Sequence, residues 1–106
     1  MLLAAGCGEE PSLARPLAGV LAARADSTAA NLQRGEFCAA RADATWLRRR
    51  TIAALNEGAV PAGLQEHLLG AVNALAEAIS CTPAGAGDGT AADARELADW
   101  LRESSD

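Results

Sequence analysis

The chain has 106 residues and a formal net charge of −5, from 14 acidic side chains against 9 arginines and no lysine. This length supports one small core, and the acidic balance argues against a nucleic-acid binder, which presents an excess of basic side chains. With one Phe, two Trp, no Tyr and abundant Ala and Leu, the composition favours helices over sheets, and no run reaches the about 18 apolar residues of a membrane span.

The N-terminus runs from apolar through small residues to a cysteine, as Leu3-Ala4-Ala5-Gly6-Cys7. This resembles the end of a bacterial lipoprotein signal peptide, in which the cysteine receives the lipid. No Lys or Arg precedes the run, which is also shorter than the about 7–15 residues of a complete apolar region. We therefore expect residues 1–7 to be the end of a truncated signal with Cys7 as lipid acceptor, and residues 8–11 to be a tether. The alternative is an accidental apolar start.

A first helix is expected from Ser12, a good N-cap, to just before Gly35, with Pro16 in or near the first turn. Its apolar positions recur at helical spacing and predict one buried stripe. The stripe consists of Leu13, Leu17, Val20, Leu21, Thr28 and Leu32.

A second helix is expected over about residues 36–56, with one apolar arc and two arginines, Arg41 and Arg48, that fall within it. Their methylene stems could cover the core while the guanidinium groups reach solvent; the alternative is a paired or ligand-binding role. Arg34, Arg41 and Arg48, seven apart, could form a basic stripe for a lipid headgroup or another polyanion. The expected arc is Phe37, Ala40, Ala44, Thr51, Ile52 and Leu55, with Leu47 at its edge.

A third helix is expected from Pro61 to about Cys81, with the clearest amphipathic pattern in the chain. Two arcs about 100° apart are what a helix needs when it contacts two neighbours, so residues 12–82 are predicted to form a three-helix bundle. The large arc is Leu64, Leu68, Val72, Leu75 and Ile79, and the small arc is Ala71, Ala74 and Ala78.

Residues 83–89 have the composition of a flexible linker, and a shorter helix is expected over residues 90–103. Thr90 is the expected N-cap, with Asp93 placed as in a capping box. This helix could dock on the bundle or fray. Its apolar residues could alternatively form a face for a partner protein, made of Leu97, Trp100 and Leu101.

Cys38 and Cys81 lie at nearly equal distances from the turn at residues 56–61. If each lies on a helix of about 29 Å, antiparallel packing brings both thiols to one end. A disulfide would close a 43-residue loop and stabilise the fold by about 4 kcal/mol. The alternative is two reduced thiols in a cytosolic protein. The wide spacing resembles neither a redox Cys-x-x-Cys pair nor a zinc site.

His67 is the only histidine, and the sequence places no nucleophile or set of metal ligands beside it. The glycines from Gly85 to Gly89 follow no strand and carry no Lys, unlike a phosphate-binding loop. We expect no catalytic residue, no metal and no cofactor.

The segment Val60-Pro61-Ala62-Gly63-Leu64-Gln65-Glu66-His67-Leu68-Leu69-Gly70-Ala71-Val72-Asn73-Ala74-Leu75, closed by Cys81, is similar to a helix found in small, Ala- and Arg-rich actinobacterial lipoproteins. The similarity covers about residues 3–82 and implies a two-cysteine helical hairpin and a lipid anchor, with no activity to transfer.

Together these patterns predict an all-α antiparallel three-helix bundle with a shorter C-terminal fourth helix and a Cys38–Cys81 disulfide. We expect a binding or structural module, held at the outer face of the cell membrane by its N-terminal lipid and open to a protein partner. The alternative is a cytosolic regulator with reduced cysteines that pairs with another protein.

Overall fold

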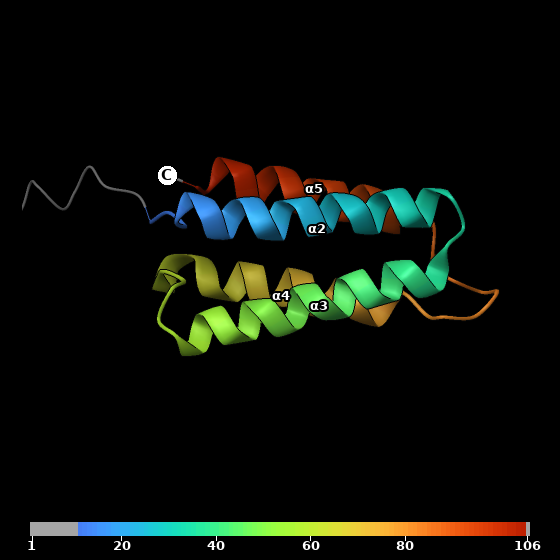
Figure 1. Cartoon of the computed structure of the whole chain (residues 1–106), viewed down its shortest axis with the longest axis horizontal. Coiled ribbons are helices and arrows are strands. Elements are labelled where there is room, and N and C mark those ends of the chain that lie inside the picture. Colours follow the sequence, from blue (N-terminus) through green and yellow to red (C-terminus); the bar gives the residue numbers. More distant parts are fainter. Residues whose placement is uncertain (1–10, 106) are drawn as a thin grey trace, which may run out of the picture.

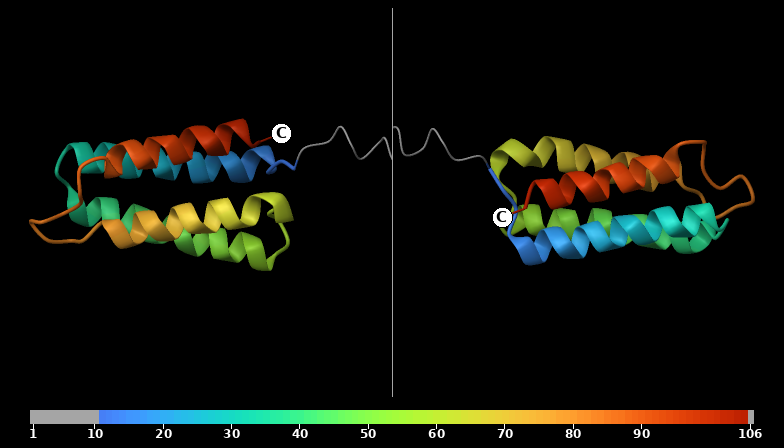
Figure 2. Two further views of the ribbon diagram at one scale, coloured as in Figure 1. Left: turned by 180° about the vertical axis from the view of Figure 1, so that it is seen from behind. Right: turned by 90° about the horizontal axis from the view of Figure 1, so that it is seen from above.

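The computed structural model describes residues 11–105, which form four α-helices in one bundle (Figure 1). Each helix runs antiparallel to the one before it, and their long axes lie side by side (Figure 2). The described residues contain no β-strand, only isolated bridges. The predicted all-α antiparallel bundle is confirmed. Its helices are α2 (Arg15–Gln33), α3 (Phe37–Asn56), α4 (Ala62–Ala78) and α5 (Thr90–Glu103).

The four helices form two layers, with α2 and α3 in one and α4 and α5 in the other (Figures 1 and 2). α2 packs closely against both α3 and α5, and α3 packs against α4, whereas α4 and α5 touch least. The C-terminal helix therefore docks and completes the bundle. The segment before α2 is also joined to the end of α5, since the Leu13 amide donates to the Ser104 carbonyl at 2.7 Å.

The core is built largely from alanine, because small side chains let α2 approach two neighbours closely. On α2, alanines recur every three or four residues along the buried side, and larger aliphatic residues fill the space between the layers. The fully buried large residues include Leu21, Leu47, Leu68, Val72, Ile79 and Leu101, and the α2 ridge is Ala18, Ala22, Ala25 and Ala29.

Two residues expected in the core are exposed. The exposed fraction of the surface is 49% for Val20 and 42% for Ile52. The helical period was right, but the buried face of each helix is centred on its alanines, which turns Val20 on α2 and Ile52 on α3 toward solvent. Among the described residues, no helix is long and apolar enough to cross a membrane.

The ends of α2 and α5 differ from the predicted caps. α2 begins at Arg15, so Ser12 is not its N-cap, although Pro16 lies in the first turn as expected. Thr90 is the first residue of α5, and its hydroxyl donates to the Gly87 carbonyl at 2.9 Å, so the expected capping box with Asp93 does not form.

The loop after α4 folds back on itself through backbone contacts. The Ser80 amide donates to the Gly85 carbonyl at 2.8 Å, and Ile79 bridges to Ala86. Gly85 has φ +64°, and a Cβ there would come within 2.5 Å of the Phe37 ring. The loop thus folds back over the start of α3 and delivers the chain to α5.

Candidate functional site

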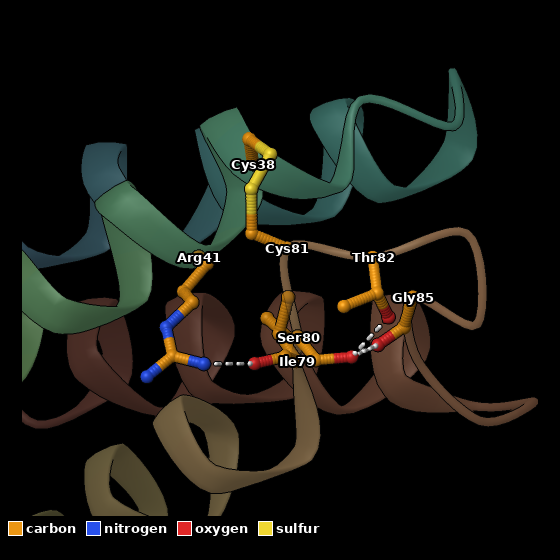
Figure 3. Close-up of a disulfide and its surroundings, with 7 residues drawn as sticks. All are labelled: Cys38, Arg41, Ile79, Ser80, Cys81, Thr82 and Gly85. Atoms are coloured by element: carbon orange, nitrogen blue, oxygen red, sulfur yellow. Dashed lines mark hydrogen bonds between the residues drawn. A yellow bond between two sulfur atoms is a disulfide. The ribbon is translucent and has the colours of Figure 1, made fainter.

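The predicted disulfide joins Cys38, in the first turn of α3, to Cys81, with the two Cα atoms 4.3 Å apart (Figure 3). Its geometry differs from the expected one in one respect. α4 ends at Ala78 and Ile79 is extended, so Cys81 lies in the following loop and not on the helix. Both cysteines are exposed. The disulfide therefore staples the end of α4 and its loop to α3 from the outside.

Side-chain hydrogen bonds surround the disulfide (Figure 3). The Arg41 guanidinium donates to the Ile79 carbonyl at 3.4 Å, which caps a group left free by the end of α4. The Ser80 hydroxyl lies 3.0 Å from the Thr82 hydroxyl and donates to the Gly85 carbonyl at 3.2 Å. A disulfide held in this way is characteristic of proteins that work in an oxidising, extracytoplasmic compartment.

A carboxylate network closes the seam between α2 and α3. Asp43 accepts hydrogen bonds from the Ser27 hydroxyl at 2.7 Å, the Asn31 amide at 3.0 Å and the Arg24 guanidinium at 3.4 Å. Only 14% of its side chain is exposed. Sequence reasoning missed this cluster. The available signal was Ser27 and Asn31, polar residues four apart on a helix whose buried positions are mostly apolar.

The outer surface of this same seam carries a shallow basic depression of about 500 Å³. Arg24 lies over the Trp46 ring, with the guanidinium carbon 4.2 Å from the ring centroid. Arg41 and Arg49 lie on the same depression, beside Cys38 and Thr45.

The predicted stripe of Arg34, Arg41 and Arg48 is therefore only partly assembled. Arg34 contacts Asn31 and Glu36 at the turn after α2. Arg48 does not line the depression. The structure instead brings Arg24 from α2 together with Arg41 and Arg49 from α3.

The seam between α4 and α5 is open along part of its length and forms a groove of about 240 Å³. The arc of small residues on α4 was expected to touch a second helix, but it lines this groove, and Ala74 and Ala78 are exposed. On the α5 side the groove meets the carboxylates of Asp93 and Glu96. The remaining lining residues are His67, Ala71, Leu75, Thr90 and Leu97.

One end of the groove is marked by an aromatic contact between its two helices. The His67 ring on α4 lies 4.4 Å from the Trp100 ring on α5, with the planes tilted by 41°. His67 is exposed. Within residues 11–105, no cluster of three His, Cys, Asp or Glu side chains could hold a metal ion.

The proposed partner face on α5 needs correction for two of its three residues. Leu97 and Leu101 are buried in the core, so neither lies on an exposed face of α5, although Leu97 contributes to the floor of the α4–α5 groove. Trp100 is half-buried beside His67. The predicted lipid acceptor Cys7 lies outside the described residues. Comparison with protein-family models, with curated proteins and with solved structures found no match for this chain.

Proposed function

We propose that the chain is an extracytoplasmic helical binding module, anchored to the outer face of the cell membrane by a lipid on Cys7. The observation that carries this proposal is the Cys38–Cys81 disulfide, which argues for an oxidising compartment. The Leu3–Cys7 pattern, similar to the end of a lipoprotein signal, supports the anchor. With one thiol lipidated and two paired, all three cysteines of the chain are used.

Binding is assigned to the α4–α5 groove, whose surface combines alanine and leucine side chains with the carboxylates of Asp93 and Glu96. Such a lining suits an apolar ligand group that carries a positive charge. The ligand's hydrocarbon part contacts the apolar floor of the groove, and its charge lies against the carboxylates. Its volume is below the about 300–1,000 Å³ of most small-molecule pockets. It fits one long basic side chain of a partner, or an alkylammonium of similar size.

The anchor is tested by metabolic labelling with an alkyne fatty acid in cells that express the gene in its own context. Wild-type protein should carry the label and enter the detergent phase, and Cys7→Ser should do neither. Alkylation before reduction should leave Cys38 and Cys81 unmodified. Free thiols at both positions with no label would overturn the proposal in favour of a cytosolic regulator.

The groove is tested by NMR titration of the oxidised chain with n-hexylammonium, and with hexanoate as a probe of equal length and opposite charge. Amide shifts should concentrate at Ala71, Ala74 and Glu96 for the cation and be much weaker for the anion. The double variant Asp93→Asn, Glu96→Gln should lose the difference between the probes. Equal responses to both probes would reject the charge-selective site.

A further inference from the structure

The exposed aliphatic residues of the bundle lie on the layer that faces away from the groove. Among residues 11–105, the large hydrophobic side chains that remain strongly exposed are Val20 on α2 and Ile52 on α3. Val20 precedes Arg24 by four residues, and Ile52 follows Arg49 by three, so each shares a helix face with a lining residue of the basic depression. Aliphatic and basic groups therefore adjoin on this side.

Most of the arginines lie on the α2–α3 layer, where Arg50 alone of the α3 arginines has an ion pair within residues 11–105, with Glu57 at 3.9 Å. α3 carries Arg41, Arg48, Arg49 and Arg50, and its one acidic residue, Asp43, is turned inward to α2. In contrast, α4 has no arginine, and the two arginines of α5 contact Asp26 of α2. The outer α2–α3 layer is thus locally basic although the whole chain is acidic.

From this juxtaposition we infer that the outer α2–α3 face, defined by Val20, Arg24, Arg41, Trp46, Arg49 and Ile52, docks on an anionic phospholipid surface. Arginine recognises phosphate through a planar fork of donors, and tryptophan is favoured at the boundary between headgroups and hydrocarbon. Val20 and Ile52 can enter the upper part of the lipid layer. This docking goes beyond the lipid anchor, because it orients the domain as well as retaining it.

The net charge of −5 does not prevent this contact, because distance and screening separate the two layers. The axes of packed helices lie about 8–10 Å apart. Carboxylates on the outer side of α4 and α5 are therefore more than one helix spacing away from the docking face. The Debye length at about 0.15 M ionic strength is about 8 Å. An anionic surface against α3 therefore responds mainly to the nearby arginines. Arg24 keeps 37% of its side-chain surface exposed even while it pairs with Asp43.

The orientation also has a consequence for the groove. Figure 1 shows α2 and α3 in front, and the view from behind in Figure 2 shows α4 and α5 in front. A membrane that contacts the first layer leaves the second layer facing away from the lipid. The α4–α5 groove is then presented outward.

The test uses the oxidised full-length chain with Cys7→Ser, so that binding cannot come from a lipid on the protein. It is sedimented with vesicles of phosphatidylcholine alone and of phosphatidylcholine mixed with phosphatidylglycerol, at about 0.1 M salt. Binding should require the anionic lipid and weaken as salt is raised. With Trp100→Phe as background, brominated lipids should quench Trp46.

Arg49→Gln should lower the vesicle partition coefficient about fivefold, as expected for one basic residue near an anionic surface. Arg95→Gln on α5 removes the same charge from the other layer and should change it less than twofold. Ile52→Gln should also reduce binding, and circular dichroism should show all three folded. No binding to anionic vesicles, or equal losses for Arg49→Gln and Arg95→Gln, would overturn the inference. Because Cys7 is absent, neither result bears on the anchor.

Discussion

The α2–α3 seam and the α4–α5 seam are both antiparallel helix pairs, yet one is closed and the other is open. At the first, Asp43 reaches across to Ser27 and Asn31 and is almost buried. At the second, alanines of α4 face carboxylates of α5 across a groove. A pair of amphipathic helices thus closes only where the side chains at the seam are long enough, and complementary enough, to bridge it.

The two seams also differ in what holds their ends. α2 and α3 are joined by a short turn at Arg34–Glu36, so their proximity is fixed locally. α4 and α5 are joined by a longer loop, which is held to α3 by the disulfide and by the packing of Gly85 on Phe37. The open seam therefore depends on contacts outside itself. Three variants test that difference, and a fourth tests a buried hydroxyl of α3.

The largest effect is expected from the double variant Cys38→Ser, Cys81→Ser. Loss of a cross-link that closes 43 residues should lower the free energy of unfolding by about 4 kcal/mol, measured by denaturant titration. Hydrogen exchange should accelerate more in residues 79–90 than in the α2–α3 seam. Cys7→Ser serves as the control and should leave stability unchanged; equal acceleration in both seams would contradict the proposed dependence.

Gly85→Ala should lower the free energy of unfolding by about 2–3 kcal/mol, because the new Cβ would meet the Phe37 ring and the backbone has positive φ. Gly89→Ala is the matched control. It shares the positive φ, at +89°, but its Cβ would enter open space, so it should cost only about 1–2 kcal/mol. Thermal unfolding of both variants would separate the steric part from the backbone part. Equal losses would show that the Phe37 contact contributes nothing.

Asp43→Ala should destabilise the closed seam by about 2 kcal/mol, since it leaves the half-buried hydroxyl of Ser27 and the buried amide of Asn31 without their acceptor. Glu96→Ala removes a carboxylate from the open seam and should cost less than about 0.5 kcal/mol. Urea denaturation, analysed with one m-value for both variants, would measure the two losses of stability. A larger loss for Glu96→Ala would reverse the assignment of closed and open seams.

The smallest expected effect is a gain. The Thr51 hydroxyl is buried and has no hydrogen-bond partner among the described residues, so Thr51→Val should stabilise the protein by about 1 kcal/mol. Thr28→Val is the matched control on α2, where the hydroxyl donates to the Arg24 carbonyl at 2.9 Å. It should give no gain. Differential scanning calorimetry of the pair would show whether the unsatisfied hydroxyl is the cause.

The order of the helices and the cysteine pairing could be predicted because each depends on strong local signals. Leu64, Leu68, Val72 and Leu75 repeat at helical spacing, and Cys38 and Cys81 flank one turn at matched distances. Which face each helix buries was harder, as Ile52 shows. In an alanine-rich chain the hydrophobic pattern is broad, and close approach of backbones decides which arc is covered.

The sites could be predicted only in part, because they depend on pairs of residues from different helices. Sequence spacing placed Arg41 on a basic surface but chose Arg34 and Arg48 as its companions. The structure provides Arg24, from another helix, and Arg49. Likewise, Ala71, Ala74 and Ala78 were recognised as a separate arc, but an arc of small residues does not reveal whether a neighbour fills the space beside it.

The hydrogen bond between Leu13 and Ser104 affects how the domain responds to a mechanical force. The Leu13 amide bonds the Ser104 carbonyl, so the chain enters α2 and leaves α5 at one pole, opposite the disulfide (Figure 1). A force applied to the chain ahead of Leu13 would therefore act on α5 as well as on α2. A reporter fused after Ser105 would emerge beside the start of α2, at the end of the bundle opposite the disulfide.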